Sequence, residues 1–72
     1  MRVKARIYRN VQVHDQEIYG TLGATMLSGG VFRWILTFSD VGIKIEAPTL
    51  SELLRYAHDP INNVVDIRPC AT

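Results

Sequence analysis

Apolar and polar positions alternate strictly along residues 2–8, the first patterned segment of the chain. Its odd-numbered positions are apolar, whereas its even-numbered positions carry positive charges or tyrosine. A period of two is typical of a β-strand with one buried face. A second alternating segment, Ile18–Met26, includes two glycines, which often mark a bulge or close backbone packing. We therefore expect two strands in this part of the chain, separated by a polar turn at residues 14–16.

Residues 31–39 carry the strongest strand pattern. Four large apolar side chains share one of its faces: Phe32, Trp34, Leu36 and Phe38. Aromatic residues are enriched in strands, and we expect these four side chains to form the centre of the hydrophobic core. The glycine-rich turn at residues 28–30 precedes this strand, because glycine reaches positive φ without steric penalty. A short turn then leads into Ile43–Ala47, and the two strands are predicted to form a hairpin.

A short helix is expected to follow Pro48, which ends the preceding strand because it cannot donate to a sheet ladder. Thr49 can cap its first turn, and Glu52, three residues later, completes a capping box. Apolar residues then recur at helical spacing: Leu50, Leu53, Leu54 and Ala57. They predict one apolar stripe that packs against the sheet. Asp59 and Pro60 end the helix, because a residue before proline avoids the α region.

The last strand is predicted at residues 64–68, and 16 residues separate it from Ile43–Ala47. This spacing is long enough for a crossover that places the two strands parallel. Together the segments predict an α+β fold: a small, mostly antiparallel sheet of about five strands, in the order ββββαβ, with one helix packed on its apolar face. A chain of 72 residues makes a single domain, residues 1–72.

Charge is concentrated locally rather than over the whole chain. Eight basic and seven acidic residues give a net charge of +1, too weak for long-range steering. One basic row on the first strand stands out: Arg2, Lys4 and Arg6, with Tyr8. Such a row fits a solvated strand face or a charged guard of a sheet edge. It also fits contact with nucleic acid or an acidic protein surface, and the near-neutral total disfavours nucleic acid.

Residues with catalytic or metal-binding chemistry are sparse. Cys70 is the only cysteine, so an internal disulfide is excluded and a reducing cytoplasm is the expected setting. His14 and His58 lack other ligand residues at metal-binding spacing. No apolar run approaches the roughly 18 residues of a spanning helix. We expect a protein that is not an enzyme, holds no metal or cofactor and does not enter a membrane.

Three features of residues 32–70 occur in an order and spacing found in a known family. An aromatic strand at residues 32–37 precedes a short hairpin, and a strand ending in Ala47 runs into the helix start Thr49-Leu50-Ser51-Glu52. The chain then closes with Arg68-Pro69-Cys70 shortly before its last residue. In these features the chain resembles the small inhibitor of bacterial RNA polymerase made early by T-seven-type bacteriophages, the gene-two protein family.

The resemblance implies a non-enzymatic inhibitor in the cytoplasm of a bacterial host. Proteins of that family bind the jaw of the largest polymerase subunit, engage the N-terminal region of the σ factor and prevent productive promoter opening. Two arginines on their last strand make the essential contacts. Arg68 matches the second of these, whereas Asp66 stands in place of the first, so the contact is expected to differ there. Arg33 and Arg55 are further candidate contacts, because guanidinium pairs bidentately with carboxylates.

Other functions fit the same residues. A second phage-type inhibitor, an anti-CRISPR protein that blocks a nucleic-acid-recognition surface, needs no catalytic residues either. A small nucleic-acid-binding module would use the basic row on residues 2–8. A homo-oligomer built by pairing of edge strands is a further alternative. The sequence thus favours a binding protein, with RNA polymerase as the first partner to test.

Overall fold

The computed structural model describes residues 1–9, 12–13 and 16–70 of the chain. The described residues form six strands, one α-helix and one 3-10 turn. The elements are β1 (Arg2–Arg9), β2 (Gln12–Val13), β3 (Ile18–Met26), β4 (Phe32–Phe38), η1 (Ser39–Val41), β5 (Ile43–Ala47), α1 (Leu50–His58) and β6 (Val64–Pro69). Residues 14 and 15 of the predicted polar turn lie outside the described residues.

The strands form one antiparallel sheet. Strand β1 pairs with β3 and β6, β3 pairs with β4, and β4 pairs with β5, all antiparallel. The two-residue strand β2 pairs with the end of β1. The predicted α+β class, with a small sheet and one helix, is confirmed, and β2 is the strand beyond the expected set.

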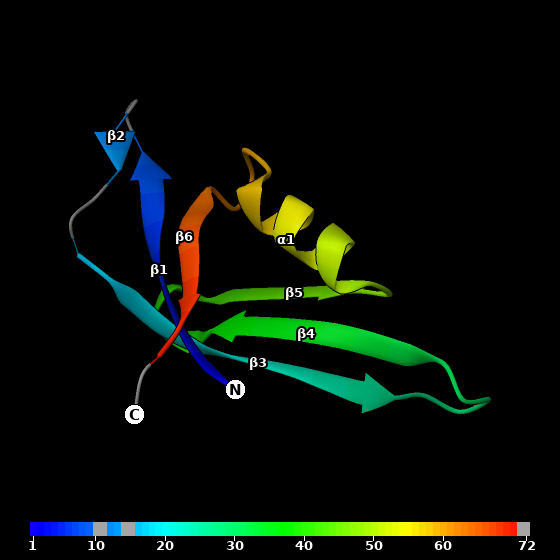
Figure 1. The fold of residues 1–72 in the computed structure, drawn as a ribbon. Helices are drawn as coiled ribbons and strands as arrows, with labels where there is room; N and C mark the ends of the chain where they lie inside the picture. Colours follow the sequence, from blue (N-terminus) through cyan, green and yellow to red (C-terminus); the bar gives the residue numbers. More distant parts are fainter. Residues whose placement is uncertain (10–11, 14–15, 71–72) are drawn as a thin grey trace.

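The strands on either side of the helix run parallel, as the spacing predicts, but they do not pair with each other. Strands β5 and β6 run in the same direction, but they lie at opposite ends of the sheet path, and β6 pairs with β1 instead. Figure 1 shows β1 and β6 at a steep angle to β3, β4 and β5, with α1 in the angle between the two groups. The spacing would allow β6 to pair with β5, but β1 also has a free edge and an apolar face. The length of the crossover does not decide which of these two strands β6 pairs with.

The hydrophobic core lies between the sheet and α1. The buried residues are Val3, Ala5, Ile7, Ile18, Leu36, Phe38, Ile45, Ala47, Leu53, Ala57 and Val64. The predicted inner face of β1 is therefore confirmed, and Ile45 and Ala47 of β5 are buried on the same side. We call the side of the sheet that carries α1 the inner face and the opposite side the outer face.

Strand β4 corrects the prediction that its four large side chains form the centre of the core. Leu36 and Phe38 are fully buried, whereas Trp34 is half-buried and Phe32 is 54% exposed. The reason is the length of the helix. With nine residues, α1 is about 13 Å long, and it covers β4, β5 and β6 only where these strands pass directly beneath it. The far end of the β3–β4 hairpin extends beyond this cover.

The helix begins and ends where the sequence predicts. The Oγ1 atom of Thr49 accepts a hydrogen bond of 3.2 Å from the backbone N–H of Glu52, which satisfies one of the free donors of the first turn. At the other end, the backbone N–H of Asp59 donates to the carbonyl oxygen of Tyr56 at 3.1 Å. The side-chain amide of Asn62 donates to the same carbonyl at 3.0 Å. These contacts join α1 to the start of β6.

One of the two glycines of β3 marks close backbone packing, as the sequence suggests. A Cβ atom on Gly20 would clash with the carbonyl oxygen of Thr37 and approach Cδ1 of Phe38 to 2.7 Å. Gly20 lies where β3 changes partners, because β1 pairs with residues 18–21 and β4 with residues 21–26. Gly23 has open space around it.

Candidate partner-binding surface

One group of charged side chains on the outer face of the sheet lies at the end where β1 pairs with β3 and β6. Lys4 lies directly opposite Tyr19 of β3 on one side and Arg68 of β6 on the other. Directly opposed residues share one face of a sheet. The predicted row on β1 therefore continues across strands, with Arg68 beside Lys4.

Five charged residues gather around this point, and we call them the charged cluster: Lys4, Arg6, Glu17, Asp66 and Arg68. They line a hollow of about 20 Å³, room for roughly one water molecule. The Nζ atom of Lys4 lies 3.8 Å from Oε2 of Glu17. Arg68 and Asp66 are exposed, whereas Lys4 and Arg6 are half-buried. The hollow is too small for a substrate, so any partner would have to meet the cluster at its exposed surface.

A β-bulge in β6 sets the direction of Arg68. The β1–β6 register pairs Arg6 with Val65 and Lys4 with Arg68, so two residues of β6 face the single residue Ala5. Asp66, the first of the two, has a φ of 55°. A bulge adds one residue to one strand and shifts the alternation that follows. Regular alternation from the buried Val64 would direct Arg68 inward, and the extra residue directs it outward.

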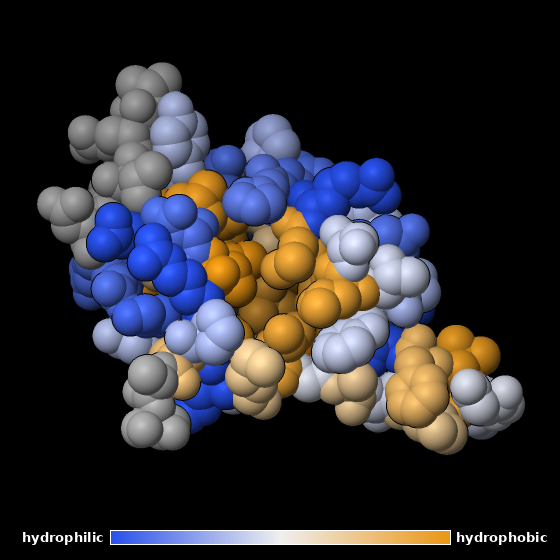
Figure 2. Space-filling view, in the orientation of Figure 1, coloured by the Kyte–Doolittle hydropathy of each residue, from blue (hydrophilic) through white to orange (hydrophobic). Residues whose placement is uncertain are grey.

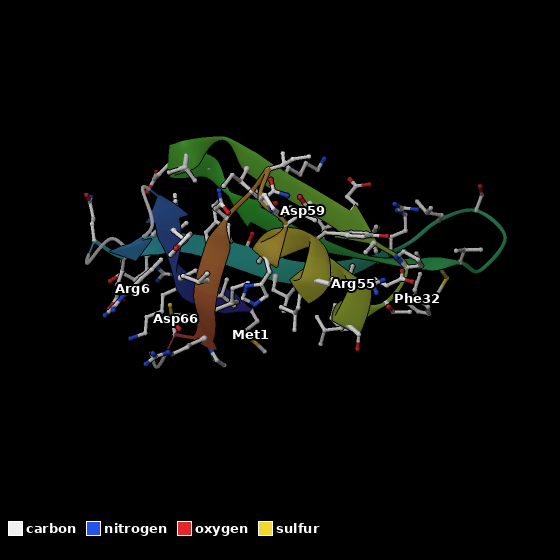
Figure 3. All side chains as sticks on the ribbon, turned by 90° about the horizontal axis from the view of Figure 1, so that it is seen from above. Met1, Arg6, Phe32, Arg55, Asp59 and Asp66 are labelled. Carbon is white, nitrogen blue, oxygen red and sulfur yellow. The ribbon has the colours of Figure 1, made fainter. Side chains whose placement is uncertain are left out.

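The remaining predicted site residues lie apart from the charged cluster. Arg33 on β4 is near the far end of the hairpin, where its Nε atom lies 3.5 Å from Oε2 of Glu46 on β5. Arg55 is exposed on α1. Figure 3 shows Arg6 and Asp66 at one end of the molecule, Phe32 at the other and Arg55 on the helix between them. The structure thus joins Arg68 and Asp66 to the basic row, but not to Arg33 or Arg55.

A second, shallower hollow of about 200 Å³ lies next to the cluster. Its lining residues are Arg2, Tyr19, Gly20, Thr21, Thr37 and Ser39. Two residues that sequence reasoning missed, Glu17 and Tyr19, border these hollows. The sequence does indicate that Tyr19 points outward, because it alternates with the buried Ile18. Its position beside Lys4 could not be predicted, because it depends on the pairing of β1 with β3. Tyr8, the last member of the predicted row, is 39% exposed.

Among residues 1–9, 12–13 and 16–70, no group of three His, Cys, Asp or Glu side chains is placed to hold a metal ion. His14 lies outside this set. Cys70 is a half-buried free thiol. None of the helices in the described part of the chain has the length and apolar character required to cross a membrane.

Comparison with protein-family models, curated proteins and solved structures finds no significant match to this chain. Its function must therefore be argued from its own surface.

Proposed function

We propose that this chain is a non-enzymatic binding protein that docks its charged cluster onto an acidic surface of a larger protein assembly in the bacterial cytoplasm. Bacterial RNA polymerase is the first partner to test, and inhibition of transcription is the expected effect. The observation that carries the proposal is the bulge in β6. The bulge turns Arg68 outward, beside Lys4. Without it, in the same sequence, Arg68 would point into the interior, where a buried arginine has to be paired.

The mixture of charges favours a protein partner over a nucleic acid. Three cations of the cluster stand among two carboxylates, Glu17 and Asp66. Carboxylates repel the phosphates of a nucleic acid backbone, which is bound by surfaces with a clear basic excess. A protein surface offers groups of both signs, and such complementarity fixes the orientation of docking.

Arg68 is the residue expected to contribute most to binding. It is exposed on the last strand, and its guanidinium group can form two parallel hydrogen bonds with a partner carboxylate. Asp66, two residues before it, would accept hydrogen bonds from a partner's lysine or arginine. The pair thus presents one donor and one acceptor group side by side.

The choice of RNA polymerase rests on the resemblance of residues 32–70 to the phage inhibitor family. Those proteins use arginines of their last strand, and Arg68 is an exposed arginine on the last strand of this chain. Asp66 replaces the other arginine of the pair, so the binding mode is expected to involve a basic group of the polymerase there. The charged residues of β1 extend the contact surface.

The test is binding to purified bacterial RNA polymerase holoenzyme, with transcription from a strong promoter as a second readout. Arg68→Ala is expected to weaken binding at least about tenfold, since a central arginine of an interface is often worth about 2 kcal/mol. Lys44→Ala is the matched control, because it removes an exposed positive charge on β5, away from the cluster. Unchanged transcription at saturating protein, together with no detectable binding, would reject the polymerase as the partner.

Parallel measurements separate the other functions. Binding to a CRISPR effector complex that depends on Arg68, without binding to polymerase, would keep the charged cluster as the interface and change the partner. Binding to a single-stranded oligonucleotide that falls steeply with added salt would instead replace the protein partner with nucleic acid.

A further inference from the structure

Strand β3 has a free edge over its second half. Strand β1 pairs with residues 18–21 of β3. Met1 extends this pairing by one residue, because its amino group donates to the carbonyl oxygen of Leu22 and its carbonyl accepts from the N–H of Leu22, both at 2.8 Å. Within the described part of the chain, no strand pairs with residues 23–26 on this side. Their other side is paired with β4 through Met26.

The unpaired backbone groups on this edge can be assigned. Successive residues of an antiparallel strand direct their N–H and C=O groups to opposite sides. Leu22 directs both groups toward β1. Ala24 and Met26 therefore direct theirs to the same side, past the start of β1, where they meet solvent. The free edge thus offers two donors and two acceptors in the spacing of a sheet ladder.

The other two edges of the sheet carry features that discourage pairing. Strand β6 has the bulge at Asp66 and ends in Pro69, and strand β5 is short and carries the exposed Lys44. Bulges, prolines and charges are the devices by which natural sheets protect their edges. The free edge of β3 has none of them, since residues 18–32 contain no charged residue and no proline.

Exposed apolar side chains surround the same edge. The end of the β3–β4 hairpin exposes Met26 (60%), Leu27 (45%), Val31 (54%) and Phe32 (54%). Figure 2 shows these apolar residues gathered at the tip of the hairpin, away from the hydrophilic side chains at the opposite end. Contiguous exposed apolar surface next to unpaired backbone is typical of a protein interface.

We infer that this edge binds a second copy of the same chain. In the pairing that the backbone directions allow, Ala24 of each copy lies opposite Met26 of the other, and Thr25 lies opposite its own counterpart on a two-fold axis. The two pairs form four backbone hydrogen bonds. A two-fold axis places the residues that lie close to it near their own copies, so a charge here would face an equal charge, and the uncharged edge avoids that repulsion.

The inner faces of the two copies also match. Phe32 lies opposite Met26, and Trp34 opposite Ala24, in the β3–β4 register. Pairing of the two β3 strands would therefore join Phe32 and Met26 of one copy to Ala24 and Trp34 of the other in one apolar row. Burial of this row adds to the hydrogen bonds, which alone would hold a short edge only weakly.

The test is the mass of the full chain in solution, measured by sedimentation from low concentration up to about 1 mM, where even weak interfaces are occupied. We expect a concentration-dependent dimer of twice the 8.1 kDa chain mass. Thr25→Lys places two lysines face to face on the axis and is expected to leave a monomer throughout. Thr21→Lys is the matched control, because Thr21 lies on the same strand and face but is paired with β1.

Hydrogen exchange of the wild-type chain gives a readout that needs no variant. Dimerisation predicts that the amides of Ala24 and Met26 gain protection as the concentration rises, while the amide of Lys44 on the β5 edge does not. A monomer at every concentration would overturn the inference and leave the edge open to an unrelated extended peptide. A dimer that survives Thr25→Lys but is lost in Thr21→Lys would overturn it as well.

Discussion

At the scale of single residues, Asp66 has the most demanding backbone conformation of the charged cluster. Its φ of 55° lies in the left-handed region, which costs most L-residues roughly 1–2 kcal/mol. Aspartate and asparagine enter this region more readily than other side chains, because their short polar groups can bond to the nearby backbone. The bulge therefore explains the residue type at this position without reference to a partner.

Substitutions of Asp66 separate its backbone role from its charge. Asp66→Ala should lower the free energy of unfolding by about 1 kcal/mol, whereas Asp66→Gly should leave it equal or higher, because glycine adopts positive φ without penalty. Asp66→Asn keeps the backbone preference, removes the charge and should leave stability within about 0.5 kcal/mol. Urea unfolding measures all three. Equal stability of the alanine and glycine variants would contradict the assigned conformation.

At the scale of elements, β3 holds the two halves of the sheet together. It pairs with β1 at one end and with β4 at the other, and the change occurs next to Gly20. The space above Gly20 is filled by the backbone of β4 and the ring of Phe38. Position 20 therefore has to lack a side chain for β3 to pass from β1 to β4. The angle between β1 and β6 on one side and β3, β4 and β5 on the other depends on this.

Two glycine substitutions on this strand are expected to have opposite effects. Gly20→Ala should lower the free energy of unfolding by about 3 kcal/mol, because the added methyl group meets backbone that cannot rotate away. Gly23→Ala should raise it by about 0.5 kcal/mol, since it meets nothing and alanine loses less chain entropy than glycine. Thermal and urea unfolding of the two variants provide the comparison. Similar effects of both would show that the crossing is not tightly packed.

The elements were predictable from the sequence because each has its own periodicity. Alternation located β1, β3, β4 and β5, and the cap at Thr49 with Pro60 located α1. Strand pairing was not predictable in this way, since periodicity shows which face is buried but not which strand lies beside it. The bulge was hidden for a related reason: an extra residue at Asp66 looks like a break in alternation.

The candidate surface was predictable only in part. The row on β1 and Arg68 were each identified from residue type, but their juxtaposition depends on the β1–β6 pairing, which the spacing of the last two strands does not predict. Phe32 shows the reverse error. Its strand pattern is that of a core residue, but the helix that would cover it is too short.

At the scale of the whole molecule, the two proposed interfaces lie at opposite ends. The charged cluster lies where β1 pairs with β6. The apolar free edge lies on residues 23–26 of β3, near the end of the β3–β4 hairpin. Figure 3 shows this separation through Arg6 and Asp66 at one end and Phe32 at the other. Binding to a partner and pairing of copies should therefore proceed independently.

This independence is testable with the same variants. Mutations at distant sites that share no contacts are usually additive within about 0.5 kcal/mol. Arg68→Ala should leave the dimer dissociation constant unchanged within about twofold, and Thr25→Lys should leave the affinity of each single chain for its partner equally unaffected. Sedimentation and binding to monovalently captured partner provide the two measurements. Loss of dimerisation in Arg68→Ala would show that the two ends are coupled.

The bulge in β6 also has a consequence for how such a chain can evolve. A point substitution changes a side chain but leaves the direction of every residue after the bulge intact. Loss of a single codon at Asp66 would instead remove the bulge, place Ile67 alone opposite the buried Ala5 and leave Arg68 opposite Lys4 on the outer face. Variation by substitution can therefore adjust the outer face gradually, and one in-frame deletion at Asp66 could straighten the strand without reversing the arginine's orientation.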